Sequence, residues 1–465
     1  MVAAAAWAAL AAACGSGPAP IRNHIGAAPT DCGAIPPSTS TKPVEVTLWS
    51  YNPSLAELAA EFNRAQTGVR VKVQAKGNAE KMARAYLLAA TGGKGLPDLV
   101  QLPGFATAPA VDTGSVVAAQ VCIDATGYDL GDFLPQTLAT TKVAGTQWAM
   151  PGALDDAEVF LFDQKAFARA GLDPAQPPAT VAELLEAARA LATAGIARPM
   201  GPLWFTDELM LSTPMTDGGE GHDGRPTRAT FDTDAARRIY RANAQIIEEG
   251  LAAPIPRTPQ GDLDAIAAGR AAMTIHPIAD LRSVAASQAR PQIGGSSLAV
   301  GPVPTATGPG GVLIRSNSLF ISRSSTVATR GAAWSFLTWL HAPKQQAAGM
   351  VSSKSFFFPT RRSAATDPMV VEVFTKQPLL AAAWGLFSNA PAVPVPAIGP
   401  HSHLIGALDS VLKSTSADAA SLDEALSTAA RSVDAELATY NADPVRYVAC
   451  ASLPSSAGRD VSSCR

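Results

Sequence analysis

The sequence Val44-Glu45-Val46-Thr47-Leu48-Trp49 alternates apolar and polar residues, which is typical of a β-strand with one buried face. Ser54 follows, and Glu57 lies three residues further on, at the spacing of a helix-capping box. The next predicted elements are a strand, a helix and a strand, at 69–73, 79–90 and 97–102. This strand–helix–strand–helix–strand order predicts a parallel α/β sheet.

The same alternation continues along the chain. Residues 158–162 are predicted to form a strand, and Thr180 with Glu183 forms a second capping box at the start of a helix. The remaining predicted elements are a helix at 233–249, strands at 271–275 and 319–321, and helices at 327–340 and 421–439. The fold class predicted for the whole chain is therefore α/β.

Composition bounds the class of protein. The chain has 465 residues, of which 47% are hydrophobic and 16% charged, so it is predicted to fold into two or three globular domains. The formal net charge of -3 provides no basic surface for phosphates, which argues against a nucleic-acid partner.

The N-terminus has the features of an export signal. Residues 1–13 are apolar and end in small residues directly before Cys14, which fits a signal peptide too short to span a bilayer. A Cys in this context resembles a bacterial lipobox, in which the Cys is diacylated. No Lys or Arg precedes the apolar run, and Ala11 stands where Leu is usual, so an Ala-rich leader is the alternative. Residues 14–43 are expected to be a flexible, lipid-anchored tether.

Cysteine usage agrees with export. If Cys14 carries lipid, four cysteines remain, and an even number in an exported chain favours two disulfides with three possible pairings. Cys450 and Cys464 lie close together in a Ser- and Gly-rich tail and are favoured as partners, which leaves Cys32 with Cys122. No CxxC motif or metal-like cluster is present, so no metal and no cofactor is expected.

Seven stretches carry a resemblance to a known family, and they occur in the family's order at 46–49, 96–100, 148–151, 161–172, 268–275, 332–337 and 359–363. The sequence resembles the extracellular solute-binding proteins of ABC importers, in the group that includes maltose- and glycerophosphodiester-binding members. The resemblance implies a two-lobed periplasmic-binding-protein fold, class II-like, in which each lobe is a sheet flanked by helices and the ligand lies between the lobes.

The resemblance also implies where the chain passes between the lobes. Crossings are expected near 149–153, near 276–279, and at the start of a helix at 331–340. The expected domains are a signal peptide at 1–13, a tether at 14–43, a discontinuous first lobe at 44–150 and 277–330, a discontinuous second lobe at 151–276 and 331–441, and a disulfide-closed tail at 442–465.

A sugar-binding cleft needs flat apolar faces and polar partners for hydroxyl groups. The candidate ligand-binding residues follow predicted strands, lie at expected crossings or flank a Pro-rich segment: Trp49, Tyr51, Asn52, Phe105, Asp155, Asp156, Trp204, Phe205, Asp217, His276, Gly310, Gly311, Trp384 and His403. Trp49 is equally compatible with a core position. One of Asp155 and Asp156 is the favoured hydroxyl acceptor. Arg361 is either structural or a ligand clamp.

Two features of the sequence limit the functional hypothesis. His276 stands where maltose-binding members of the family carry Trp, which argues against a linear glucan. The motifs GxSxG, HExxH, Walker A and GxGxxG after a strand are missing, so the chain is not expected to be an enzyme. The favoured function is that of a monomeric lipoprotein on the outer face of the cytoplasmic membrane, which delivers a small polar ligand, a carbohydrate, to ABC permease subunits. The alternatives are a glycerophosphodiester or other polar metabolite as ligand, or an envelope sensor.

Overall fold

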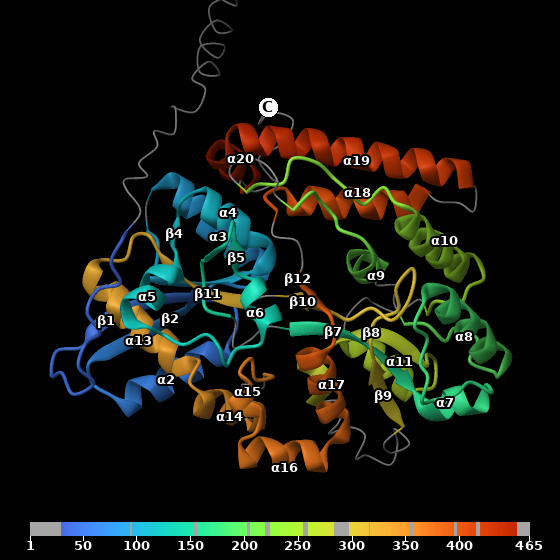
Figure 1. Cartoon of the computed structure of the whole chain (residues 1–465), viewed down its shortest axis with the longest axis horizontal. Helices are drawn as coiled ribbons and strands as arrows, with labels where there is room; N and C mark the ends of the chain where they lie inside the picture. The colour runs from blue at the N-terminus through green and yellow to red at the C-terminus, as the bar shows by residue number, and fades with distance from the viewer. Residues whose placement is uncertain are drawn as a thin grey trace, which may run out of the picture.

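A computed structural model describes residues 29–93, 95–151, 156–201, 205–218, 224–253, 259–282, 297–315, 317–352, 357–394, 398–414 and 419–452. These residues form two α/β lobes, shown side by side in Figure 1. The expected α/β class and two-lobed architecture are confirmed, and the sheets are flanked by helices as the sequence predicted. No helix in the described part of the chain is long and apolar enough to cross a membrane.

The first lobe contains a five-stranded sheet in the order β2-β1-β3-β11-β4. Strands β1, β2 and β3 run parallel, and β11 is antiparallel to both β3 and β4. The strands are β1 (Val44–Ser50), β2 (Val69–Ala75), β3 (Leu99–Pro103), β4 (Val116–Val117) and β11 (Asn317–Ser322). The helices of this lobe are α2 (Ser54–Ala65), α3 (Ala79–Gly92), the 3-10 turn η1 (Gly104–Ala106), α4 (Thr107–Asp112), α5 (Ala119–Thr126), α13 (Val327–Leu340) and α20 (Pro444–Ala451).

The second lobe contains a sheet in the order β12-β10-β7-β8, with β9 paired to β7. Its strands are β7 (Asp156–Asp163), β8 (Met273–Pro277), β9 (Leu298–Gly301), β10 (Val312–Arg315) and β12 (Ala392–Pro394). Its helices are α7 (Gln164–Arg169), α8 (Val181–Thr193), α9 (Phe205–Ser212), α10 (Asp234–Glu248), α11 (Pro259–Ala267), η2 (Ile278–Asp280), α14 (Pro343–Val351), α15 (Arg362–Ala365), α16 (Pro368–Lys376), α17 (Pro378–Asn389), α18 (His401–Ser414) and α19 (Ala419–Ala442).

Helix α6 (Pro135–Ala139) and the hairpin β5 (Lys142–Val143) and β6 (Thr146–Gln147) precede the first passage between the lobes. The capping box predicted at Thr180 and Glu183 is present: the Thr180 hydroxyl accepts the Glu183 N–H, and the Glu183 carboxylate accepts the Thr180 N–H. This reciprocal pair satisfies two backbone donors at the start of α8, which explains why the helix begins there.

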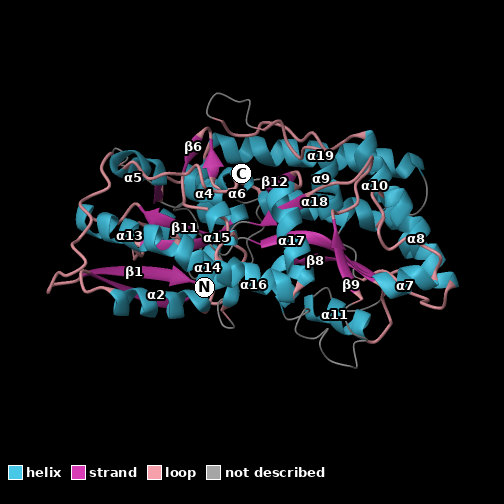
Figure 2. Ribbon diagram, turned by 60° about the horizontal axis from the view of Figure 1, so that its bottom comes forward, coloured by secondary structure: helices cyan, strands magenta, loops and turns pink. Residues whose placement is uncertain are grey.

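The chain passes between the lobes several times. Figure 2 shows β1 and β11 on one side of the molecule and β8 and β9 on the other. Met150 still pairs with β11 of the first sheet, and Asp156 opens β7 of the second. The chain returns at 315–317, where β10 of the second sheet is followed by β11 of the first. It leaves again after Leu340, because α13 packs in the first core and α14 in the second.

These passages correct the expected lobe boundaries. No crossing occurs at 276–279, since Ile278 and Leu281 are buried in the core of the second lobe. Strands β9 and β10 belong to the second sheet, although 277–330 was expected in the first lobe. Helix α13 belongs to the first lobe, although 331–441 was expected in the second. Strand alternation predicted the elements but contained no signal for the sheet that each would join.

The C-terminal segment also departs from the expected tail. Helix α19 contributes Leu437 to the core of the second lobe and Tyr440 to the core of the first. Helix α20 then packs Tyr447 and Val448 against α3 in the first lobe. In Figure 1 these helices lie across one side of both lobes. Residues 442–452 are therefore part of the fold.

The described part of the expected tether, residues 29–43, is held on the first lobe. Cys32 is buried and joined to Cys122 by a disulfide, which is the pairing favoured from the sequence. Gly33 has φ +75° and lies so close to α13 that an added Cβ would stand 1.9 Å from the Val327 carbonyl oxygen. Cys450 is also disulfide-bonded. The signal peptide, Cys14 and Cys464 lie outside the described residues.

Candidate functional site

Polar groups of the first lobe gather where β1 and β3 end. Gln101, fully buried in β3, accepts hydrogen bonds through its Oε1 from the Ser50 hydroxyl at 2.8 Å and from the Asn52 N–H at 3.2 Å. Its Nε2 has no hydrogen-bond partner among the described residues. Because an unsatisfied buried amide costs about 1–3 kcal/mol, Gln101 is a candidate hydrogen-bond donor to a bound molecule.

Tyr51 lies beside this group and reaches the second passage of the chain, at 315–317. Its hydroxyl donates to Oδ1 of Asn317, the first residue of β11. Trp49 is half-buried, and the Lys76 ammonium group stands 4.1 Å above its ring, a favourable cation–π arrangement. Asn52 uses its side-chain Oδ1 to accept the Ser54 N–H at the start of α2. These three candidates therefore lie together at one edge of the first sheet.

The second lobe presents a charged group next to the same passage. Arg315, the last residue of β10, donates through Nε to Glu158 Oε1 at 2.9 Å and through Nη2 to Asp207 Oδ1 at 2.5 Å. Both carboxylates are almost fully buried, whereas 38% of the Arg315 side chain is exposed. We call Arg315, Glu158 and Asp207 the Arg315 cluster. The register of β10 and β7 also pairs Arg315 with Asp156.

Glu208 extends this cluster into the second lobe. It follows Asp207 on α9, is fully buried, and accepts a hydrogen bond at 2.7 Å from the Asn243 side chain on α10. Burial raises the pKa of Glu208 to about 7; the Asn243 hydrogen bond opposes the shift, and the Asp207 charge reinforces it. Glu208 therefore holds a proton over much of the acidic range.

A cavity of about 440 Å³ lies between helices of the first lobe and helix α18 of the second lobe. Phe105, on η1 directly after β3, stacks on His401 of α18, with ring centroids 5.7 Å apart and planes inclined by 15°. The wall also contains residues of α3, α4, α18 and α20, among them Glu80, Arg84, Ile405 and Tyr447. The cavity therefore combines an aromatic face with charged and hydroxyl-bearing groups, which suits a polar molecule with an apolar face.

Two candidate residues are core residues instead. Phe205 is 2% exposed and packs against Tyr240 with centroids 5.5 Å apart, because it occupies the inner side of α9. The expected stacking platform at Phe205 is therefore wrong. His276 is fully buried in β8, 3.8 Å from Asp262, and cannot line a cleft in this state. Trp204 and Asp155 lie outside the described residues, as does the side chain of Asp156.

Three further candidates have structural roles. The Gly310 N–H donates to the Val303 carbonyl oxygen, and a Cβ on Gly311 would stand 1.4 Å from the Pro391 carbonyl oxygen. These glycines thus permit close backbone packing, and the Gly310 N–H does not face a ligand as expected. The Asp217 carboxylate accepts the N–H and hydroxyl of Thr227, which orders its own loop.

The last two candidates make contacts within the fold. Trp384 on α17 donates from Nε1 to the Pro359 carbonyl oxygen at 3.4 Å and packs near Phe374. His403 is 2.9 Å from the hydroxyl of Ser432 and thereby links α18 to α19 within the second lobe. Its neighbour His401, two residues earlier in the chain, is the residue that meets the first lobe.

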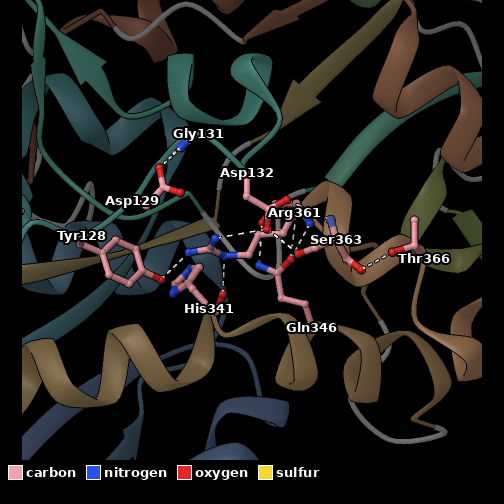
Figure 3. A network of polar contacts seen from close by, with 10 residues as sticks. Tyr128, Asp129, Gly131, Asp132, His341, Gln346, Arg361, Ser363 and Thr366 are labelled. Carbon is pink, nitrogen blue, oxygen red and sulfur yellow. Dashed lines mark hydrogen bonds and ion pairs between the residues drawn. The ribbon is translucent and has the colours of Figure 1, made fainter.

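Arg361 has a structural role, shown in Figure 3. Its guanidinium donates to the His341 carbonyl oxygen at 2.7 Å, to the Tyr128 hydroxyl at 2.7 Å and to Asp132 at 3.3 Å. It also lies 3.9 Å from the centre of the Phe133 ring. Only 7% of Arg361 is exposed, so it is not a ligand clamp. We call these five residues the Arg361 network.

The Arg361 network joins the passages between the lobes. The His341 ring contacts the Leu337 carbonyl oxygen at 2.7 Å and the Pro151 carbonyl oxygen of the first passage. Burial lowers the pKa of His341 to about 4, so the ring is uncharged at neutral pH. The carbonyl oxygen of Thr360, the residue before Arg361, accepts the Leu134 N–H at 2.8 Å. Segments distant in sequence are thereby fixed to one another at the junction.

The Arg315 cluster and Asn317 were missed by sequence reasoning. A signal existed for Arg315, which ends the apolar run Val312-Leu313-Ile314, since a charge at the end of a buried strand needs a partner. Asp207 and Glu208 gave a second signal as adjacent acids directly before the apolar run Leu209-Met210-Leu211. Neither signal indicates that β10, α9 and β7 bring these residues together.

Two α/β lobes joined by several passages, with a cavity and polar groups at the junction, define a two-lobed solute-binding protein. Residues 49–347, more than half of the chain, match the family "Bacterial extracellular solute-binding protein", and the chain belongs to this family.

Solved structures support the fold. The sugar-binding protein MalE of Xanthomonas citri is similar with a TM-score of 0.69 and 21% identity over 86% of this chain and 98% of that chain. UgpB of Mycobacterium tuberculosis, solved with glycerophosphocholine, is similar with a TM-score of 0.68 and 18% identity over 86% of this chain and 100% of that chain.

A curated relative matches at higher identity over a shorter stretch. The sn-glycerol-3-phosphate-binding periplasmic protein UgpB of Brucella abortus is 31% identical over 162 residues, which is 33% of this chain and 36% of the relative. The match therefore spans about a third of either protein.

Proposed function

We propose that this chain is an extracytoplasmic lipoprotein that binds a small polar solute between its lobes and delivers it to the permease of an ABC importer. It acts by binding alone, as a monomer, without cofactor or catalysis. The observation that carries the proposal is the meeting of polar groups from both lobes at 315–317, with Tyr51, Gln101 and Asn317 on one side and the Arg315 cluster on the other.

Ligand-driven closure follows from this arrangement. A solute that contacts both lobes at once stabilises the closed form relative to the open form, because each lobe alone supplies only part of its hydrogen bonds. The closed form then presents a continuous surface from both lobes, which the permease can distinguish from the open protein. The passages at 150–156, 315–317 and 340–343 connect the lobes and allow this movement.

Carbohydrate is the proposed ligand class. The Phe105 and His401 rings offer flat faces beside the cavity, and the polar groups at 315–317 offer donors and acceptors for hydroxyls. The X. citri neighbour is a sugar-binding protein, which agrees with this class. The second candidate is a glycerophosphodiester, because the curated relative is an sn-glycerol-3-phosphate-binding protein.

Attachment to the membrane is proposed through Cys14. Small residues directly before Cys14 support cleavage and diacylation, which would hold the protein on the outer face of the cytoplasmic membrane. With a basic signal peptide fused in front, wild type is expected in the membrane fraction and Cys14→Ala in the soluble fraction. Retention of Cys14→Ala on membranes would refute the anchor. A sensor with the same fold would show the same fractionation but no import.

The test of the proposed function is a ligand screen by thermal unfolding. Purified protein is heated with uncharged mono- and oligosaccharides, sn-glycerol-3-phosphate and glycerophosphocholine. A true ligand at 100 times its dissociation constant stabilises the folded state by about 2.7 kcal/mol. Tyr51→Ala should weaken the hit by about tenfold, because the side chain reaches from the first lobe to the junction. Equal affinity in Tyr51→Ala would place the cleft elsewhere.

A further inference from the structure

The charge of Arg315 is already compensated in the free protein. Its guanidinium donates to two carboxylates, Glu158 and Asp207, that are 2% and 1% exposed. By formal charge, the Arg315 cluster therefore carries one positive and two negative charges. Two carboxylates buried at this depth require the guanidinium, since an unpaired buried charge is strongly destabilising. The cation is a structural partner of these carboxylates before any ligand arrives.

The exposed part of the side chain nevertheless lies at the junction. With 38% of its side chain accessible, Arg315 differs from the two acids that hold it, and it ends β10 directly before the chain enters the first lobe. The two carboxylates fix the plane of the guanidinium, so its accessible edge has one orientation. A donor fixed in this way loses little conformational freedom when it binds a ligand.

The wall of the cavity beside Phe105 and His401 has no net positive charge among its described acids and bases. It includes one acid, Glu80, and one base, Arg84, on successive turns of α3. An anionic group bound against Arg315 would stand near the Glu158 and Asp207 carboxylates, which would repel it. A hydroxyl oxygen accepts the same N–H groups without bringing a charge into this environment.

We infer that Arg315 is a specificity-determining residue that donates to hydroxyl oxygens of an uncharged polyol, and that Glu158 and Asp207 exclude phosphate-bearing solutes from the same position. This inference rests on the proposed function and selects between its two ligand classes. Phosphate-bearing solutes are excluded by Glu158 and Asp207, the acidic partners of Arg315, so these are the residues to substitute.

The first variant removes one acidic charge while keeping an acceptor. In Asp207→Asn the amide oxygen still accepts from Arg315, and the formal charge of the cluster becomes zero. Affinity for sn-glycerol-3-phosphate should rise by about tenfold or more at low salt, and the gain should shrink at high salt. Affinity for an uncharged oligosaccharide found in the screen should change by less than about threefold, as the donors remain. Isothermal titration measures both.

The matched control is Asp234→Asn. Asp234 lies on α10 of the same lobe with 88% of its side chain exposed, and the substitution changes the net charge of the protein by the same amount. It should leave both affinities unchanged. An equal gain of sn-glycerol-3-phosphate affinity in Asp234→Asn would assign the effect to overall charge and overturn the inference.

The second variant tests the donor itself. Arg315→Lys keeps the positive charge but loses the planar fork, so affinity for the uncharged oligosaccharide should fall by about tenfold while the ligand-free protein keeps its melting temperature within a few degrees. A fall in melting temperature with unchanged affinity would reduce Arg315 to a structural role and overturn the inference.

The two hypotheses fail in different ways. If wild type binds sn-glycerol-3-phosphate or glycerophosphocholine tightly and binds no uncharged sugar, the inference is overturned and the proposed function stands. If neither class of solute stabilises the protein, the proposed function is overturned and the inference falls with it. Tight binding of an uncharged sugar, together with the gain in Asp207→Asn, supports both.

Discussion

Two arginines mark the junction of the lobes, and they differ in what surrounds them. Only 9% of the Arg361 side chain is exposed, and it contacts three hydrogen-bond acceptors and an aromatic ring. Arg315 is held by two buried carboxylates, yet 38% of its side chain is accessible. The Arg361 network thus has its donors directed at protein atoms, whereas the Arg315 cluster keeps an accessible edge. Exposure together with fixed geometry distinguishes a ligand-facing charge from a structural one.

The largest effect is expected at Arg361. Arg361→Ala leaves Asp132 and the His341 carbonyl without their partner and removes the contact with Phe133, so unfolding free energy should fall by about 3–5 kcal/mol. Denaturant titration measures this change. Arg362→Ala is the control, since that neighbouring side chain is exposed and its loss should cost less than about 0.5 kcal/mol. Equal losses in the two variants would contradict the structural role of Arg361.

The next effect concerns the proton on Glu208, beside the Arg315 cluster. The pKa of Glu208 is raised from 4.5 to about 7, so the folded protein retains a proton that the unfolded chain has released between these values. Stability should therefore fall as pH rises from 4.5 to 7, by on the order of 2–3 kcal/mol for this group.

Glu208→Gln checks this proton. The amide retains an acceptor for Asn243 but does not titrate, so the variant should lose this part of the pH dependence and exceed wild type in stability at pH 8. Melting temperatures of both proteins from pH 4.5 to 8 provide the measurement. Parallel curves for the two proteins would show that Glu208 titrates normally.

A smaller effect on stability is expected at Arg315. Arg315→Gln leaves two buried carboxylates without their cation, but water can reach the position through the accessible edge, so the loss should be about 1–3 kcal/mol. Adding Asp207→Asn should recover part of it, because one of the two charges is removed as well. Denaturant titration of the single and double variants tests the coupling. Strict additivity would argue against a shared cluster.

The smallest effect is expected at Tyr51. Tyr51→Phe removes only the hydroxyl that donates to Asn317, so unfolding free energy should fall by about 0.5–1.5 kcal/mol. If this bond also orients the ligand-facing edge of the first sheet, affinity should fall with it. Thermal unfolding with and without ligand separates the effect on stability from the effect on affinity. An unchanged melting temperature would mean that the hydrogen bond contributes nothing to the fold.

Local chemistry in the sequence predicted the elements well and the junction poorly. The box at Thr180 and Glu183 and the helix at 327–340 are present because both depend on residues within a few positions of one another. The return passage at 315–317 is difficult to predict because β10 and β11 are separated by a single residue. Its position depends on which sheet each strand joins, which is a long-range property.

In the candidate site, too, local features were predicted from the sequence and long-range ones were not. Tyr51, Asn52 and Phe105 were predicted from their place after parallel strands, and the structure brings them to one edge. Phe205 was misassigned because a loop was expected where α9 begins, and a helix directs that side chain inward. Arg315 was overlooked because the neighbours that give it meaning, Glu158 and Asp207, are far away in the chain.

Helix α19 limits how the lobes can move. It is continuous from Ala419 to Ala442, about 36 Å at 1.5 Å per residue, and its residues Leu437 and Tyr440 are buried in different lobes. Between α13 and α14, His341 and Ala342 are not helical and can change direction by backbone rotation, but a helix cannot bend sharply without breaking its hydrogen bonds. The end of α19 should therefore act as the pivot, with displacement growing with distance from it. Residues of each lobe that lie far from Tyr440 should move farthest. Labels for distance measurements should be placed at these residues.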